Sequence, residues 1–157
     1  MTTDIQNIDY IENVTYDELQ IGTTANITRV LTQADIELFA TVSGDINPAH
    51  LDDDYARDSM FHHVIAHGMW GGAIISAVLG TELPGPGTIY LGQELHFKKP
   101  VSLGDTITTT VTVKEKRDDK KVVVFDCKCV NQEGKEVIIG TAEVIAPSQK
   151  IRRPKVI

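Results

Sequence analysis

Cysteine, long apolar runs and basic residues are all scarce in this sequence, and each scarcity excludes a class of protein. The chain has two cysteines, Cys127 and Cys129, which are too few for a disulfide framework. Their one-residue spacing places both on one side of a strand, where a mutual bond is awkward. We therefore expect free thiols in a reducing compartment, the cytoplasm. No apolar run reaches the ~18 residues of a membrane span, and the acidic segment of residues 1–20 is expected to be neither a signal peptide nor a transit peptide.

Positive charge is outweighed by negative charge. The 15 Lys and Arg residues stand against 22 Asp and Glu residues, which gives a formal net charge of −7. Such a balance repels nucleic-acid phosphates and anionic membrane surfaces. The one basic cluster, Lys150–Lys155, sits at the end of the sequence. We therefore expect no nucleic-acid partner and no membrane partner.

The rest of the composition is that of a globular protein. The 157 residues are 41% hydrophobic and 24% charged, which suits one domain with a single sizeable core. We predict that residues 1–147 form this domain. The composition changes after that point, so residues 148–157 are expected to be a basic tail, or a linker to a possible C-terminal fused domain.

The first half of the chain predicts one strand and two helices. Thr24–Gln33 alternates imperfectly and is rich in β-branched residues, which favours a strand. Thr32 is a suitable N-cap and Asp35 a favourable first-turn residue for the helix that follows. Gly44 suits the left-handed position that ends this helix. Asp52–Asp58 then predicts one or two further helical turns.

The second half predicts a buried helix and a sheet. Met69–Leu83 is apolar on nearly every side, which is typical of a buried helix, and Pro84–Gly87 ends it. Asn131–Gly134 predicts a hairpin turn. The strands expected after the helix are Thr88–Lys98, Asp105–Lys116, Lys121–Val130 and Lys135–Ala146. One buried helix with long antiparallel strands is an α+β layered arrangement.

Four of the five histidines lie between Ser43 and Met69, and a loop made only for turning does not need imidazoles. Asp45 and His50 combine a carboxylate with an imidazole, which together can take a proton from water and deliver one elsewhere. Asn47 and the proline after it indicate a turn that brings the two side chains together. Spacing alone leaves a second interpretation open, in which Asp45 caps the turn and His50 is an ordinary loop histidine.

Gly68 stands at the predicted N-terminus of the buried helix. Backbone N–H groups there lack intrahelical partners and attract negative charge, so this amide could stabilise an oxyanion. A glycine that merely begins the helix is the alternative. A metal site is not expected, because His62, His63 and His67 do not form an H-E-x-x-H pattern.

The stretches "SGDINPAH", "HGM" and "YLGQELHFKKP" resemble the motifs of the MaoC-like, (R)-specific enoyl-CoA hydratases (the hydratase 2 family). The resemblance covers residues 22–146. It implies a hot-dog fold, in which a long antiparallel sheet wraps around one central helix. It also implies a homodimer, because the sheet leaves an edge and an apolar face that a second copy would cover.

The resemblance further implies the reaction and its site. The reaction is reversible hydration of a trans-2-enoyl-CoA to an (R)-3-hydroxyacyl-CoA, without a cofactor. Asp45 and His50 would form the catalytic dyad, and the Gly68 amide the oxyanion hole. The residues expected to contact or orient the acyl-CoA substrate are Asn47, Ser76 and Trp70. The bulk of Trp70, followed by two glycines, departs from the family pattern and leaves the acyl-chain length open.

Two other functions share this fold. The domain could bind acyl-CoA with little chemistry of its own, as the N-terminal part of a larger protein such as a phosphate acyltransferase fusion. It could also be a hot-dog thioesterase. Neither function needs the D-x-N-P-x-H loop, so the presence of both Asp45 and His50 favours the hydratase.

Overall fold

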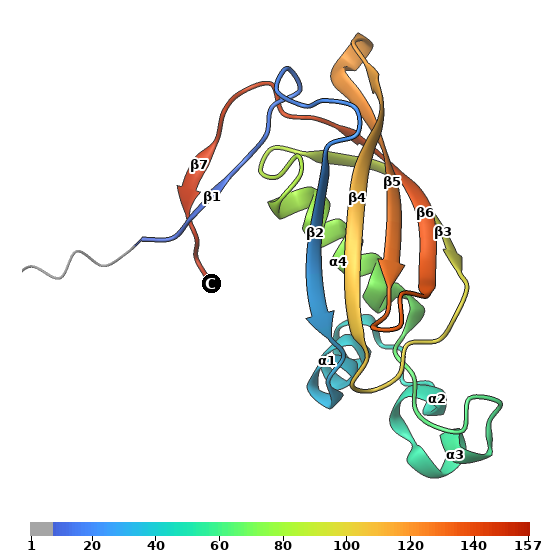
Figure 1. The fold of residues 1–157 in the computed structure, drawn as a ribbon. Helices are drawn as coiled ribbons and strands as arrows, with labels where there is room; N and C mark the ends of the chain where they lie inside the picture. Colours follow the sequence, from blue (N-terminus) through green and yellow to red (C-terminus); the bar gives the residue numbers. More distant parts are fainter. Residues whose placement is uncertain (1–7) are drawn as a thin grey trace, which may run out of the picture.

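The computed structural model describes residues 8–157, and its main feature is a five-stranded antiparallel sheet (Figure 1). The strand order is β2–β4–β5–β6–β3, with bounds β2 Thr24–Val30, β3 Ile89–Phe97, β4 Thr106–Arg117, β5 Val122–Val130 and β6 Glu136–Ile145. The last four strands match their predicted ranges to within one residue at each end. Residues 1–7 lie outside the described residues. The predicted domain and the segment that was expected to be neither a signal peptide nor a transit peptide both include them.

Side-chain alternation explains why the sheet has one buried face. In β4, the side chains of Ile107, Thr109, Val111 and Val113 are buried, and their neighbours are more exposed. The hydroxyl of Thr109 donates to the sulfur of Cys129 in β5 at 3.3 Å, so this buried hydroxyl has a partner. Successive side chains of a strand point to opposite faces, and the apolar set therefore meets one packing partner.

That partner is the helix α4, Gly68–Thr81, which lies across the sheet (Figure 1). Its residues Ile75, Val78 and Leu79 are fully buried against the strands. The predicted α+β hot-dog fold, a long antiparallel sheet wrapped around one central helix, is confirmed.

The prediction that α4 is buried on every side is wrong for the chain by itself. The side chain of Met69 is 54% exposed, and Ala73 and Ser76 are exposed beside it. The sheet covers one side of the helix, and this apolar stripe faces away from it. Ser76 therefore lies on the exposed side of the helix.

The predicted start and end of the first helix are confirmed. Helix α1 spans Gln33–Ser43, with a capping box in which Thr32 and Asp35 bond each other's backbone N–H groups. Gly44 ends it with φ 77°, a conformation that suits glycine. Two short helices follow, α2 (Pro48–Leu51) and α3 (Asp53–Asp58), and form a lobe at one end of the sheet (Figure 1).

Residues 148–157 contain a strand that the sequence did not predict. Strand β7, Arg152–Pro154, pairs antiparallel with β1, Tyr10–Glu12, and this ribbon stands apart from the main sheet (Figure 1). Asn13 holds the ribbon in place. Its side-chain amide donates to the carbonyl oxygens of Pro86 and Gln149, and its Oδ1 accepts from the N–H of Ile151.

Cys127 and Cys129 both lie in β5 and are free, buried thiols, as predicted. Within residues 8–157, no helix is long and apolar enough to cross a membrane.

Candidate active site

The loop after α1 is folded by its own polar side chains. The Ser43 hydroxyl accepts from the backbone N–H of Asp45 at 3.1 Å. Oδ1 of Asp45 accepts from the N–H of Asn47 at 3.1 Å, and Oδ1 of Asn47 accepts from the N–H of Ala49 at 3.0 Å. Asn47 is thereby the N-cap of α2. These bonds place His50, two residues into α2 from Pro48, on the same side of the loop as Asp45.

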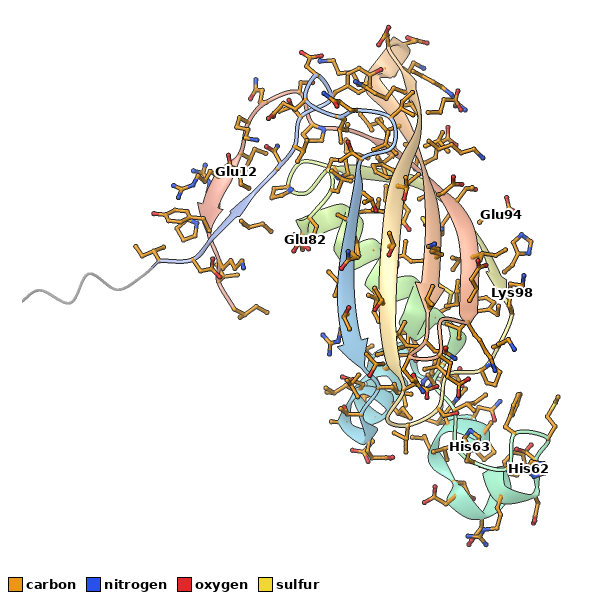
Figure 2. The ribbon with its side chains drawn as sticks, in the orientation of Figure 1. Glu12, His62, His63, Glu82, Glu94 and Lys98 are labelled. Atoms are coloured by element: carbon orange, nitrogen blue, oxygen red, sulfur yellow. The ribbon has the colours of Figure 1, made fainter. Side chains whose placement is uncertain are left out.

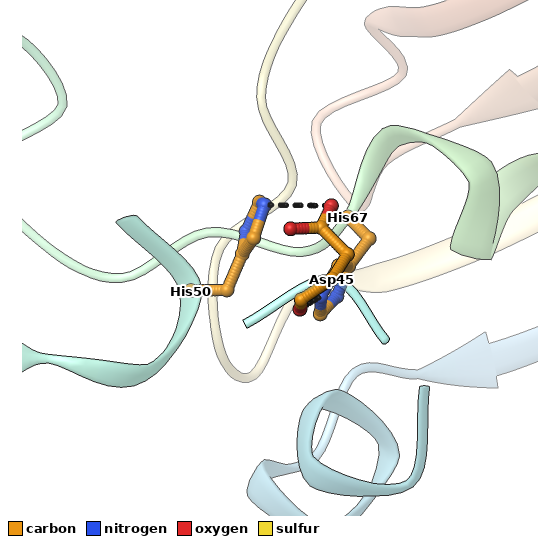
Figure 3. Close-up of side chains that lie close together, drawn as sticks. All are labelled: Asp45, His50 and His67. Atoms are coloured by element: carbon orange, nitrogen blue, oxygen red, sulfur yellow. Dashed lines mark hydrogen bonds and ion pairs between the residues drawn. The ribbon is translucent and has the colours of Figure 1, made fainter. Parts of the chain in front are cut away.

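The geometry of His50 settles which of its nitrogens faces Asp45. Nδ1 lies 2.8 Å from the carbonyl oxygen of Ile65, and a carbonyl can only accept. The Nδ1–H therefore donates, and in the neutral ring Nε2 carries a lone pair. Nε2 lies 3.8 Å from Oδ2 of Asp45 (Figure 3), which is too long for a direct hydrogen bond. Two acceptors thus face each other across a gap that a bridging donor fits.

His67 completes this cluster from the opposite side. Its ring is 3% exposed and stacks on the His50 ring with centroids 3.9 Å apart and planes 25° apart. Its Nε2 lies 2.9 Å from the carbonyl oxygen of Asp45. The ring of Phe39 in α1 also packs on it, with the two ring centroids 4.9 Å apart. The sequence alone assigned no role in the site to His67. Its contacts depend on α1 and α2 folding back together, and no spacing signals that.

Within residues 8–157, Asp45, His50 and His67 are also the one group of three possible metal-binding side chains whose potential ligand atoms lie within 4.8 Å of one another. Stacking makes them a poor metal set. The two imidazole planes are nearly parallel, so their in-plane lone pairs do not converge on one ion, and Nε2 of His67 is already bonded to Asp45. A shared zinc ion at the usual ~2.0–2.1 Å from each nitrogen would require one ring to rotate.

Gly68 is the first residue of α4 and lies next to this cluster in the chain. A Cβ on Gly68 would lie 3.0 Å from Cε1 of Phe97, so the β3 ring packs directly on the glycine. A hollow of about 410 Å³ opens here, with an apolar wall and two exposed lysines, Lys98 and Lys99. Its other lining residues include His50, Ile65, His67, Gly68, Phe97 and Val101.

The remaining candidates lie elsewhere. Trp70 is buried and lines a hollow with Phe39 and Ile74, and Ser76 lines another with Phe39 and Met69. Neither borders the hollow beside Gly68.

His62 and His63 are exposed on the lobe formed by α2 and α3 and do not join the cluster (Figure 2). Nε2 of His63 lies 2.5 Å from the Ser102 hydroxyl.

The fold and the site together define a class: a hot-dog domain with a carboxylate and an imidazole facing each other at the N-terminus of its central helix. Comparison with known proteins places the chain more closely. The family model described as "MaoC like domain" matches residues 17–134. The chain belongs to this MaoC-like domain family.

Individual relatives point to one branch of this family, the (R)-specific hydratases. The chain is 47% identical over 134 residues to an (R)-specific enoyl-CoA hydratase of Rhodospirillum rubrum, covering 85% of this chain and 92% of that protein. Among solved structures, the unliganded R-hydratase PhaJ1 from Pseudomonas aeruginosa superposes with TM-score 0.91 and 46% identity, covering 95% and 96% of the two chains. The (R)-hydratase from Aeromonas caviae gives TM-score 0.80 and 39% identity, covering 82% and 98%. The predicted resemblance to this hydratase family is confirmed.

Proposed function

We propose that this protein is an enoyl-CoA hydratase, a hydro-lyase that reversibly adds water to a trans-2-enoyl-CoA and forms an (R)-3-hydroxyacyl-CoA. The relatives named for (R)-specific hydration cover most of the chain. The observation that carries the proposal within the molecule is the pair of acceptors, Nε2 of His50 and Oδ2 of Asp45, separated by 3.8 Å.

A water molecule suits this pair because it has two O–H donors and the site offers two acceptors. Held by both, its oxygen presents its lone pairs to a bound substrate. As that oxygen bonds to C3 of the enoyl group, the dyad takes one water proton, and it returns a proton to C2. A histidine is the side chain best suited to take up and return a proton in such a step.

The charge that develops during this addition sits on the thioester oxygen. The N–H of Gly68 is a suitable donor for it, because the first N–H groups of a helix have no intrahelical partner and the helix dipole favours an anion there. Gly68 adjoins His67 and borders the same hollow as His50. One bound thioester can therefore place its carbonyl at α4 and its double bond at the dyad.

The outer parts of the acyl-CoA have candidate contacts as well. Lys98 and Lys99 are exposed cations on the hollow beside Gly68 and suit the phosphates of coenzyme A. Asn47 acts by capping α2 and so placing His50. Phe39 contacts His67 and lines both of the hollows that contain Trp70 and Ser76, so we assign the acyl chain to this side of α4.

We also propose that the protein is a homodimer. The exposed stripe of α4 is flanked by large apolar side chains from α1 and β3, among them Leu38 (68% exposed), Val42 (82%) and Leu91 (51%). A soluble monomer rarely leaves such a surface uncovered, and β3 is an edge strand. Light scattering of the native protein should give twice the chain mass, and Leu91→Lys should give the monomer. A native monomer would refute the dimer.

The free thiols of Cys127 and Cys129 suit a reducing compartment, and we propose the cytoplasm as the location of the protein.

The activity test follows loss of the ultraviolet absorbance of crotonyl-CoA, with Asp45→Asn and His50→Ala compared with the native chain. We expect fast hydration to the (R) alcohol and a loss of at least about 100-fold in each variant. Asp119→Asn and His96→Ala, which change exposed residues that do not line the hollow beside Gly68, should keep native rates. A native chain that binds enoyl-CoA of several lengths without turnover would replace the hydratase with an acyl-CoA-binding module.

A further inference from the structure

We propose that His67 is a positioning residue that holds Asp45 and His50, the two members of the dyad, in place relative to each other through one imidazole ring. This inference rests on the proposed hydratase function and adds to it a residue that does not exchange protons with the substrate. It is drawn from the contacts of His67, which reach every segment that carries the site.

The ring of His67 joins three separate pieces of chain. Its Nε2 binds the carbonyl oxygen of Asp45 at 2.9 Å, its face stacks on His50 at 3.9 Å, and its backbone leads directly into Gly68. Phe39 packs on it from α1. A displacement of this one side chain would therefore move the carboxylate, the imidazole and the helix N-terminus relative to one another.

The hydrogen bonds also indicate which nitrogen of His67 carries the hydrogen. The carbonyl of Asp45 can only accept, so Nε2 of His67 carries the hydrogen. Nδ1 is buried and has no hydrogen-bond partner among the described residues. A proton on Nδ1 would be a buried donor without an acceptor, which is costly. The tautomer with its hydrogen on Nε2 therefore satisfies the one hydrogen bond that the ring makes, the bond to Asp45.

The two nitrogens of His67 can be tested separately, because two amides mimic them. The amide nitrogen of glutamine reaches the position of Nε2, and that of asparagine reaches only the position of Nδ1. His67→Gln keeps the donor to Asp45, and His67→Asn removes it. His67→Phe removes the donor as well but keeps a flat ring to stack on His50.

The experiment measures hydration of crotonyl-CoA by the native protein first and then by these three variants. We expect kcat to fall about 10- to 100-fold in His67→Asn and His67→Phe, as is typical when reacting groups are misplaced by about 1 Å. KM should change less than about 2-fold. His67→Gln should recover most of this loss. Val123→Ala, a buried site in β5, serves as the control that lowers the melting temperature with native kcat.

The split between kcat and KM separates positioning from a general loss of structure. A displaced dyad lowers kcat in folded protein that still binds the substrate, so KM stays near its native value. A loss of folded protein would instead lower the apparent kcat in proportion to the unfolded fraction, which circular dichroism of each variant measures.

The outcomes are distinct. A native protein without hydratase activity refutes the proposed function itself. An active native protein overturns the role of His67 if His67→Asn keeps native kcat, if Gln is no better than Asn, or if the loss of rate only follows the loss of folded protein. Because the Gln and Asn variants carry the same amide and differ by the one methylene that sets its position, their comparison decides the question even if His67→Phe does not fold.

Discussion

Nδ1 of His50 lies 2.8 Å from the carbonyl oxygen of Ile65, and this contact aims Nε2 at the carboxylate of Asp45. One nitrogen of the ring, Nδ1, therefore holds the side chain in place, and the other, Nε2, is available for proton transfer. Ile65 precedes α4 by three residues, so the bond also ties α2 to the segment that leads into the central helix.

The two nitrogens of His50 predict different losses for different substitutions. In His50→Asn the amide nitrogen replaces Nδ1 and keeps the bond to Ile65, but nothing replaces Nε2. We expect the hydration rate to fall about 10²- to 10⁴-fold, the usual range for loss of a general acid–base group, with a melting temperature within about 2 °C of native. His50→Ala should lose the same activity and also stability, because the Ile65 carbonyl loses its donor. Equal activity in His50→Asn and the native chain would exclude Nε2 from the chemistry.

Gly68 and Phe97 predict a substitution that can be repaired. In Gly68→Ala the new methyl would lie 3.0 Å from Cε1 of Phe97 and would partly cover the helix N–H groups. We expect kcat to fall at least about 10-fold, since removal of one oxyanion donor typically costs 10²–10³. If crowding by the ring is the cause, Gly68→Ala with Phe97→Leu should recover part of the rate.

Gly80→Ala is the matched control in the same helix, because a Cβ there meets nothing within 4 Å. It should keep native activity and gain up to about 1 kcal/mol of stability from helix propensity. Should Gly80→Ala lose as much activity as Gly68→Ala, the effect would belong to the helix as a whole and not to its first N–H groups.

The elements of the main sheet could be predicted from sequence because their signals are local. Thr32 and Asp35 form the capping box that their spacing predicts, and Asn131–Gly134 closes its hairpin with the N–H of Gly134 bound to the carbonyl of Asn131. In the site, the approach of Asp45 to His50 was also predictable, since the turn residues between them are themselves local.

The features that the sequence did not reveal depend on contacts distant along the chain. His67 meets Asp45 only because α1 returns over the start of α4, 22 residues later. The stripe of α4 around Ser76 was predicted to be buried because the helix is apolar on nearly every side. Composition alone does not say whether a neighbouring element of the same chain covers each side. Strand β7 pairs with β1 through residues at opposite ends of the chain, and its basic composition suggested a tail.

Asn13 provides the test of that terminal ribbon. Its side chain is 1% exposed and bonds three backbone groups of residues 86, 149 and 151. Asn13→Ala leaves these groups without their partner, and we expect it to lower the free energy of unfolding by about 2 kcal/mol. Trypsin should then cut at Lys150 or Arg152 faster than in the native chain. Asn26→Ala, at an exposed position of β2, should change neither. If Asn13→Ala leaves both unchanged, the ribbon is not held by this side chain.

The two thiols of β5 predict how stability depends on pH. Burial raises the pKa of Cys127 to about 11 and raises that of Cys129 in the same direction. An unfolded thiol has a pKa near ~8.5, so above that pH the unfolded chain releases protons that the folded chain keeps. The stabilisation is complete below about pH 8.5 and is lost as the pH rises toward 11. Tyr16 and Tyr90, whose pKa values are raised to about 12 mainly by burial, act in the same direction at still higher pH.

The comparison of native protein with Cys127→Ala isolates the thiol from the tyrosines, because both proteins keep Tyr16 and Tyr90. Between pH 8 and pH 10.5 the melting temperature should fall more steeply in the native protein than in the variant, although Cys127→Ala starts from a lower value because it leaves a small cavity. A thiol reagent at pH 8 should react with native protein only as fast as the sheet opens, and at once after unfolding in denaturant. Rapid labelling of the folded protein, or parallel pH curves for the two proteins, would mean that the Cys127 thiol is accessible to solvent and not buried in the hydrophobic core.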